Sequence, residues 1–144
     1  MSSPGTTRLQ GRHILVADED PAVVAFVIHT LRSDGHAVFH AYDGQSAVEL
    51  VYALHGCDLV ISNTRVDGLP GVELIRQLRR DRPSQPILYM AHTGRSTPEI
   101  EAQLPPDVPI LREPFTADEL RAKVEPMLKG TERREEPPGD PQAR

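Results

Sequence analysis

The sequence predicts an α/β protein built on a parallel sheet of five strands with helices on both faces. Two observations carry this prediction: short apolar runs alternate with helical patterns, and the alternation repeats five times along the chain. Strands covered on both faces are apolar throughout, and strand–helix repeats place their crossover helices on both sides of a sheet. The 144 residues, 38% hydrophobic and 26% charged, fit one soluble globular domain.

The predicted strands are short runs in which nearly every residue is apolar. The first reads HILVA, and the later ones read AVFHA, DLVIS, PILYM and VPIL. Such runs between turn signals are typical of strands buried on both faces. The predicted strands cover residues 13–17, 37–41, 58–62, 86–90 and 108–111.

The predicted helices show apolar residues at helical spacing, with capping signals at their ends. Val24, Val27, Ile28 and Leu31 lie at positions i, i+3, i+4 and i+7, which form one helix face. Asp20 stands where an N-cap residue is expected for this helix. Similar apolar patterns and capping signals predict helices over residues 21–32, 44–54, 71–80, 97–103 and 116–128.

The last predicted helix contains a proline within its apolar pattern. Thr116 and Glu119 form a capping box at the start of this helix. Pro126 has no backbone N–H and its ring clashes with the preceding turn, so we expect it to kink or shorten the helix.

Composition divides the chain into three parts. Residues 1–11 are small and polar and predict a flexible N-terminal arm. Residues 129–144 are charged and proline-rich with almost no apolar side chain, which predicts a disordered tail. Residues 12–128 then form the folded domain. Because the tail is too short for a helix-turn-helix reader, we expect a stand-alone module.

Charge and composition exclude several classes of function. A net charge of −5 and only 4% aromatic residues argue against a nucleic-acid-binding protein. No stretch of 18 apolar residues is present to span a membrane, and the start of the chain lacks the apolar segment of a secretory signal. A single cysteine, Cys57, fits a reducing cytoplasm.

The residues that directly follow the predicted strands lie where sheets of this class carry their chemistry. They are Asp18, Glu19 and Asp20 after the first strand, Asn63, Thr64 and Arg65 after the third, Ala91 and His92 after the fourth, and Arg112, Glu113 and Pro114 after the fifth. The acidic cluster has two readings of about equal weight: a site for a hard cation such as Mg²⁺, or a charged loop with a helix cap.

Five blocks of sequence, in order, resemble the response-regulator receiver domain. They are ILVADEDP at 14–21, AYDGQSAVELV at 41–51, DLVISNTRVDGLPGVELIRQLR at 58–79, PILYMAHT at 86–93 and ILREPF at 110–115. The resemblance covers residues 12–128. It implies a flavodoxin-like three-layer sandwich with strand order 2-1-3-4-5 and five helices. It also implies a cis peptide bond at Pro114.

The resemblance breaks down at the residues that handle phosphate. Asn63 stands where receivers carry the phosphoacceptor Asp, and a carboxamide cannot act as a carboxylate nucleophile. Ala91 replaces a hydroxyl residue, Glu113 replaces a phosphate-binding Lys, and Ile110 replaces an aromatic switch residue. An engineered Asp-to-Asn change would alter one position only, so these four departures favour natural loss. The chain thus resembles a degenerate receiver that lacks the phosphoacceptor.

The acidic pair survives, and it leaves the question of a metal open. Asp18, Glu19 and Glu113 form an expected acidic pocket. The resemblance implies Glu19, Asn63 and the carbonyl of Arg65 as ligands of a weak Mg²⁺ site. The alternative, which we favour, is that Glu113 turns to solvent and no cofactor is required, because the usual acceptor ligand is missing.

Together these features predict an atypical receiver module of bacterial two-component signalling that is not an enzyme. We expect it to act by phosphorylation-independent contact with a histidine kinase, a downstream effector or a second copy of itself. The resemblance implies the face made by helix 97–103, strand 108–111 and helix 116–128 as the contact surface. Two alternatives stay open: a phosphorelay receiver phosphorylated on a non-standard residue, and a metal-dependent hydrolase using the acidic pocket.

Overall fold

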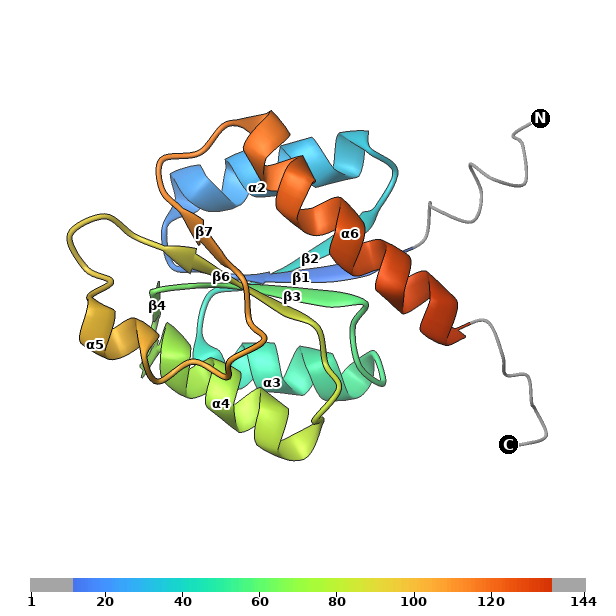
Figure 1. The fold of residues 1–144 in the computed structure, drawn as a ribbon. Helices are drawn as coiled ribbons and strands as arrows, with labels where there is room; N and C mark the ends of the chain where they lie inside the picture. The colour runs from blue at the N-terminus through green and yellow to red at the C-terminus, as the bar shows by residue number, and fades with distance from the viewer. Residues whose placement is uncertain (1–11, 136–144) are drawn as a thin grey trace, which may run out of the picture.

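A computed structural model describes residues 12–135 of the chain (Figure 1). The predicted N-terminal arm, residues 1–11, lies outside the described residues, and so do residues 136–144. Among the described residues, no helix is long and apolar enough to cross a membrane.

The centre of the molecule is a parallel sheet of five strands. Its strands are β1 (His13–Ala17), β2 (Ala37–Ala41), β3 (Leu59–Asn63), β6 (Ile87–Ala91) and β7 (Ile110–Arg112). They lie in the order β2-β1-β3-β6-β7, which confirms the predicted strand order 2-1-3-4-5.

The third and fourth strands of the sheet extend one residue further than predicted. Asn63 pairs with Met90 in the ladder between β3 and β6, and Ala91 pairs with Arg112 in the next ladder. The sequence pattern placed both residues just after their strands because an apolar run does not show where backbone pairing ends, whereas the ladder is made by the backbone. Asn63 is therefore held by the rigid end of the sheet and not by a loop.

Helices cover both faces of the sheet and complete three layers, as predicted. Helices α2 (Pro21–Ser33) and α6 (Ala117–Glu135) lie on one face (Figure 1). The other face is covered by α3 (Gly44–Ala53), α4 (Gly71–Asp81) and the short α5 (Pro98–Glu101).

Alternate residues of the central strands point into two separate hydrophobic cores. Ile14 and Val16 of β1 pack with helices α2 and α6, whereas Leu15 and Ala17 pack with the helices of the opposite face. All four residues are fully buried. This two-sided burial explains why the strand is apolar at every position.

Helix α6 corrects the predicted boundary at residue 128. The helix continues to Glu135, so residues 129–135 are helical where a disordered tail was predicted. Pro126 lies inside the helix and does not end it. Pro126 and Ala122, whose carbonyl loses its usual donor to the proline, are both exposed, so water can replace the missing hydrogen bond.

Two smaller differences concern the loops around the sheet. The helix predicted over residues 97–103 is only Pro98–Glu101, and the last strand begins at Ile110 where residue 108 was predicted. A hairpin of β4 (Arg65–Val66) and β5 (Leu69–Pro70) follows β3 and was not predicted. Strands of two residues are too short to produce a recognisable periodicity.

Candidate functional site

The candidate site lies where β1, β3 and β7 end, and Asn63 is at its centre. The Asn63 side chain donates two hydrogen bonds through Nδ2, one to Asp18 Oδ2 at 2.7 Å and one to Glu113 Oε2 at 3.0 Å. Asp18 follows β1 and Glu113 follows β7, so one amide joins three segments that are far apart in the sequence. The structure thus brings together three of the residues that the sequence singled out. It corrects the expectation that Glu113 turns to solvent, because the Glu113 carboxyl group bonds inward to Asn63.

The orientation of the Asn63 side chain is fixed by its own backbone surroundings. Its Oδ1 accepts a hydrogen bond from the backbone N–H of Thr64 at 2.5 Å. Helix α4 begins so close to this segment that a Cβ on Gly71 would lie 1.8 Å from the Asn63 carbonyl oxygen. Only glycine allows this approach, and the Gly71 N–H donates to the Thr64 carbonyl at 2.8 Å. Asn63 is 4% exposed and held on every side.

Both carboxyl groups bonded to Asn63 have raised pKa values. Burial is the main cause for Asp18, whose pKa rises although the hydrogen bond from Asn63 acts in the opposite direction. Burial also raises the pKa of Glu113, and the nearby charge of Asp18 raises it further. The inner pocket therefore holds two acids that resist ionisation, joined by a neutral amide.

Glu19 belongs to the mouth of the pocket, outside this network. Its carboxylate lies 3.7 Å from Arg65 Nε and 3.7 Å from Arg95 Nη1. These residues line a hollow of about 440 Å³ that also reaches Asp18 and Asn63. The acidic pair predicted from the sequence is therefore divided: Asp18 bonds inward to the amide, and Glu19 pairs with two arginines at the entrance.

The arrangement does not fit a bound Mg²⁺ ion. The oxygen of Asn63 is occupied by the Thr64 N–H, and its NH₂ group points at the carboxylates that a cation would need. The Glu19 carboxylate faces two guanidinium groups. Among residues 12–135 no group of three or more His, Cys, Asp or Glu side chains is placed to hold a metal ion. Of the predicted ligands, the Glu19 carboxylate and the Asn63 side-chain oxygen are thus engaged with other partners.

The remaining candidates surround the pocket without contributing a reactive group. Ala91 is buried at the end of β6, and Ile110 packs against the core below α5. The peptide bond between Glu113 and Pro114 is cis. Asp67, an acidic residue near Asn63 in the sequence, is exposed in the β4–β5 turn beside Gly68, whose φ is 81°.

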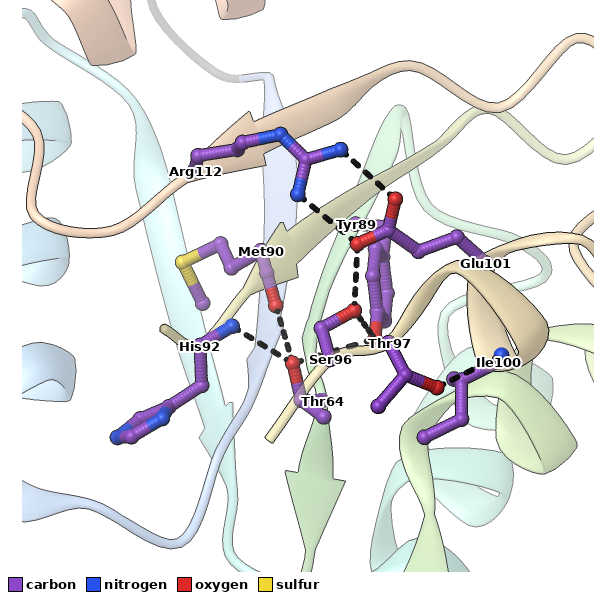
Figure 2. Close-up of polar contacts among 9 residues, drawn as sticks. All are labelled: Thr64, Tyr89, Met90, His92, Ser96, Thr97, Ile100, Glu101 and Arg112. Atoms are coloured by element: carbon purple, nitrogen blue, oxygen red, sulfur yellow. Dashed lines mark hydrogen bonds and ion pairs between the residues drawn. The ribbon is translucent and has the colours of Figure 1, made fainter. Parts of the chain in front are cut away.

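A second polar network next to the pocket was missed by sequence reasoning. The Thr64 hydroxyl accepts a hydrogen bond from the His92 N–H at 2.8 Å and contacts the Tyr89 hydroxyl at 3.2 Å (Figure 2). Tyr89 is completely buried in β6. The signal was present, because a tyrosine in a strand covered on both faces needs a hydrogen-bond partner inside the protein.

Chemically, the group at the centre of the site is poorly suited to covalent transfer. The central atom is an amide nitrogen whose protons are already shared between two carboxylates. An amide nitrogen is delocalised and a poor nucleophile. The carboxyl groups beside it would repel a phosphoryl group, and the nearest cations, Arg65 and Arg95, lie at the entrance with Glu19.

Comparison with known proteins gives two curated relatives of similar sequence. The chain is 32% identical over 117 residues to the transcriptional regulatory protein TcrA of Mycobacterium tuberculosis, covering 81% of this chain and 46% of that protein. It is 32% identical over 121 residues to the transcriptional regulatory protein FixJ of Bradyrhizobium diazoefficiens, covering 83% of this chain and 58% of that protein. The chain thus spans about half the length of these relatives.

Structural comparison and a family model agree with these relatives. A response regulator receiver protein from Sinorhizobium medicae has a TM-score of 0.74 and 27% identity, covering 85% of this chain and 98% of that one. Residues 14–125 match the model of the response regulator receiver domain. The chain therefore belongs to the response regulator receiver domain family, the signalling modules of two-component systems.

Proposed function

We propose that this receiver domain signals by phosphorylation-independent contact with a partner protein. The observation that carries the proposal is the double hydrogen bond from Asn63 Nδ2 to Asp18 and Glu113. In this arrangement the position that would accept a phosphoryl group is instead a donor that satisfies two acids. Two of the four departures predicted from the sequence, Asn63 and Glu113, thus bind each other.

Electrostatics supports this proposal. A phosphoryl group at Asn63 would meet Glu113 in place of a cation. Two like charges about 4 Å apart at an effective dielectric constant of about 20 repel by roughly 4 kcal/mol. Replacing a Lys by a Glu changes an attraction into a repulsion of similar size. Phosphoryl transfer depends on such placement of charge, so the site is poorly suited to it.

We further propose that the domain requires no Mg²⁺ ion. Support comes from the donor set, because the amide presents N–H groups towards the carboxylates. A Mg²⁺ titration followed by isothermal calorimetry should show no saturable binding to the unmodified chain. Saturable binding would instead support the weak Mg²⁺ site, and it is the first requirement of the metal-dependent hydrolase alternative.

The partner surface in this proposal is the face of α5, β7 and α6. Arg112 of β7 forms a bidentate ion pair with Glu101 of α5 and is 64% exposed. Pro105, Pro106 and Pro109 lie in the connection between α5 and β7 and give this face its own shape. We propose a histidine kinase or a downstream effector of the bacterial cytoplasm as partner, with a second copy of the chain as another occupant.

Incubation with acetyl phosphate and Mg²⁺, followed by intact mass spectrometry, tests the proposal. The unmodified chain should gain no phosphoryl group. The matched control is the triple variant Asn63→Asp, Ala91→Thr, Glu113→Lys, which should gain one phosphoryl group that hydroxylamine removes.

Two outcomes would contradict the proposal. A stoichiometric, hydroxylamine-labile phosphoryl group on the unmodified chain would show ordinary receiver chemistry. Peptide mapping that locates the group on another residue would instead support the alternative of a non-standard phosphoacceptor.

A further inference from the structure

Three hydroxyl groups form a continuous chain from the edge of the pocket to the surface of α5. The Thr64 hydroxyl lies 3.1 Å from the Met90 carbonyl oxygen and 3.2 Å from the Tyr89 hydroxyl. The Tyr89 hydroxyl lies 2.8 Å from Ser96 Oγ, and Ser96 Oγ lies 2.7 Å from Glu101 Oε2. Figure 2 shows these contacts running between the carbonyl at one end and the carboxylate at the other.

The chain of three hydroxyl groups has fewer protons to donate than it has contacts. Each of the three hydroxyls has one proton to donate, and the two ends, a carbonyl and a carboxylate, only accept. The four contacts therefore share three protons, and one contact must lack a hydrogen bond at any moment. The His92 N–H supplies its own proton to Thr64 and does not change this count.

Glu101, at the outer end of the hydroxyl chain, determines the direction in which Ser96 donates its hydrogen bond. Arg112 holds Glu101 with hydrogen bonds of 2.9 and 2.7 Å. A hydrogen bond to a carboxylate is stronger than one to a neutral oxygen, so Ser96 donates to Glu101. The single Tyr89 proton then goes either to the Thr64 hydroxyl at 3.2 Å or to Ser96 Oγ at 2.8 Å, because Ser96 has no second proton to donate.

The undecided proton is then the one on Tyr89, in the middle of the hydroxyl chain. When it goes to Thr64, the residue next to Asn63, the Thr64 hydroxyl donates to the Met90 carbonyl oxygen at 3.1 Å. If Glu101 moves away from Ser96, the hydroxyls can rotate so that Ser96 donates to Tyr89, Tyr89 to Thr64, and Thr64 to Met90. No proton leaves its oxygen in this change.

We propose that this hydroxyl chain couples the position of α5 to the end of β3, through Tyr89. The inference rests on the proposed function, since it gives a partner bound at the α5 face a route to the pocket that needs no phosphoryl group. Thr64 and Glu101 share no direct hydrogen bond, and the hydrogen-bonded route between them runs through Tyr89 and Ser96.

A double-mutant cycle tests the coupling on the unmodified protein. Thr64→Val and Glu101→Gln are combined, and the unfolding equilibrium constant is measured with urea. We expect the double variant to differ by at least about threefold from the product of the single changes. In a Tyr89→Phe background, which keeps the ring and removes the hydroxyl, the two changes should become multiplicative. Multiplicative effects with Tyr89 present, or coupling that persists with Phe, would overturn the proposal.

Hydrogen exchange gives a local readout that does not depend on the buried Tyr89→Phe variant folding. Glu101→Gln should change the protection of the His92 amide, which donates to Thr64. Asp107→Asn is the matched control, because it breaks a similar bidentate pair, with Arg79, at 2.9 and 2.8 Å. An unchanged His92 amide in Glu101→Gln, or an equal change in the control, would contradict the coupling. Both measurements use unphosphorylated protein, so their failure is distinct from failure of the phosphorylation test.

Discussion

Two buried side-chain amides lie at opposite ends of the sheet, and they bind different kinds of partner. Gln85, before β6, is 4% exposed, and so is Asn63 at the end of β3. Gln85 accepts from the Cys57 N–H at 3.1 Å and donates to the carbonyls of Cys57 and Pro86 at 2.8 and 3.0 Å. Asn63 instead donates to two carboxyl groups.

The difference separates a structural amide from a functional one. Gln85 satisfies backbone groups that every sheet of this kind must satisfy at its amino-terminal edge. Asn63 satisfies acids that the fold does not need and whose burial costs free energy. Polar groups that are expensive to bury and that bond to one another from three separate segments mark the place where this molecule carries its specific chemistry.

The largest effect is expected from the structural amide. Gln85→Leu leaves the buried N–H and carbonyl of Cys57 without their partner, whereas the Pro86 carbonyl still accepts from the Val60 N–H, so the free energy of unfolding should fall by about 3 kcal/mol. Because no titratable group is involved in these bonds, the loss should be the same across the pH range in urea titrations. Gln103→Leu, at an exposed glutamine, is the control and should change stability by less than about 0.5 kcal/mol. A small or strongly pH-dependent loss for Gln85→Leu would break the comparison.

A somewhat smaller effect is expected at the functional amide. Asn63→Asp places a third carboxyl group beside Asp18 and Glu113 and removes both donors, which should cost about 2 kcal/mol at neutral pH. Adding Glu113→Lys supplies a cation to the cluster, so the double variant should recover most of this loss. Urea unfolding of the two variants makes the comparison. Equal stability of both variants would show that charge does not govern this pocket.

The smallest effect is a pH dependence at Glu113. An acid with a raised pKa binds its proton more tightly in the folded state, so its contribution to stability is lost as pH rises from the unfolded to the folded pKa. Glu113→Gln keeps an acceptor for Asn63 and should stabilise the protein above this window, with no gain at lower pH.

Asp43 provides a control of opposite sign for this experiment. Hydrogen bonding from Ser46 lowers the pKa of Asp43, so its contribution is present above the unfolded pKa and lost as pH falls. Stability profiles of Glu113→Gln and Asp43→Asn should therefore diverge in opposite directions as pH rises. Profiles that change in the same direction would contradict the assigned causes.

The fold could be predicted from the sequence because burial leaves a pattern in it. The strands of the sheet are apolar throughout, and helix α2 repeats apolar residues at helical spacing. These patterns fixed the order of elements but not their ends. Asn63 and Ala91 belong to strands through backbone pairing, and residues 129–135 continue a helix despite their polar composition. Backbone pairing and helix propagation do not show in hydrophobicity.

The members of the site could be predicted, but not their bonds. Asn63, Asp18 and Glu113 were expected at one edge of the sheet, because parallel strands end there. That Asn63 would bridge both acids, and that Glu19 would turn to Arg65, depends on side-chain rotamers. The Tyr89–Thr64 contact joins residues 25 positions apart, and their separate strand ends gave no sign of it.

The most direct test of the central claim is an NMR measurement on the Asn63 side-chain NH₂ group. Its resonances are assigned by their loss in Asn63→Asp. Both protons should exchange slowly with water and shift as the acids titrate, and Glu113→Gln should remove the Glu113 part of that shift. An NH₂ group that exchanges as fast as one in solvent, and whose resonances do not respond to pH, would contradict the bridge between the two acids.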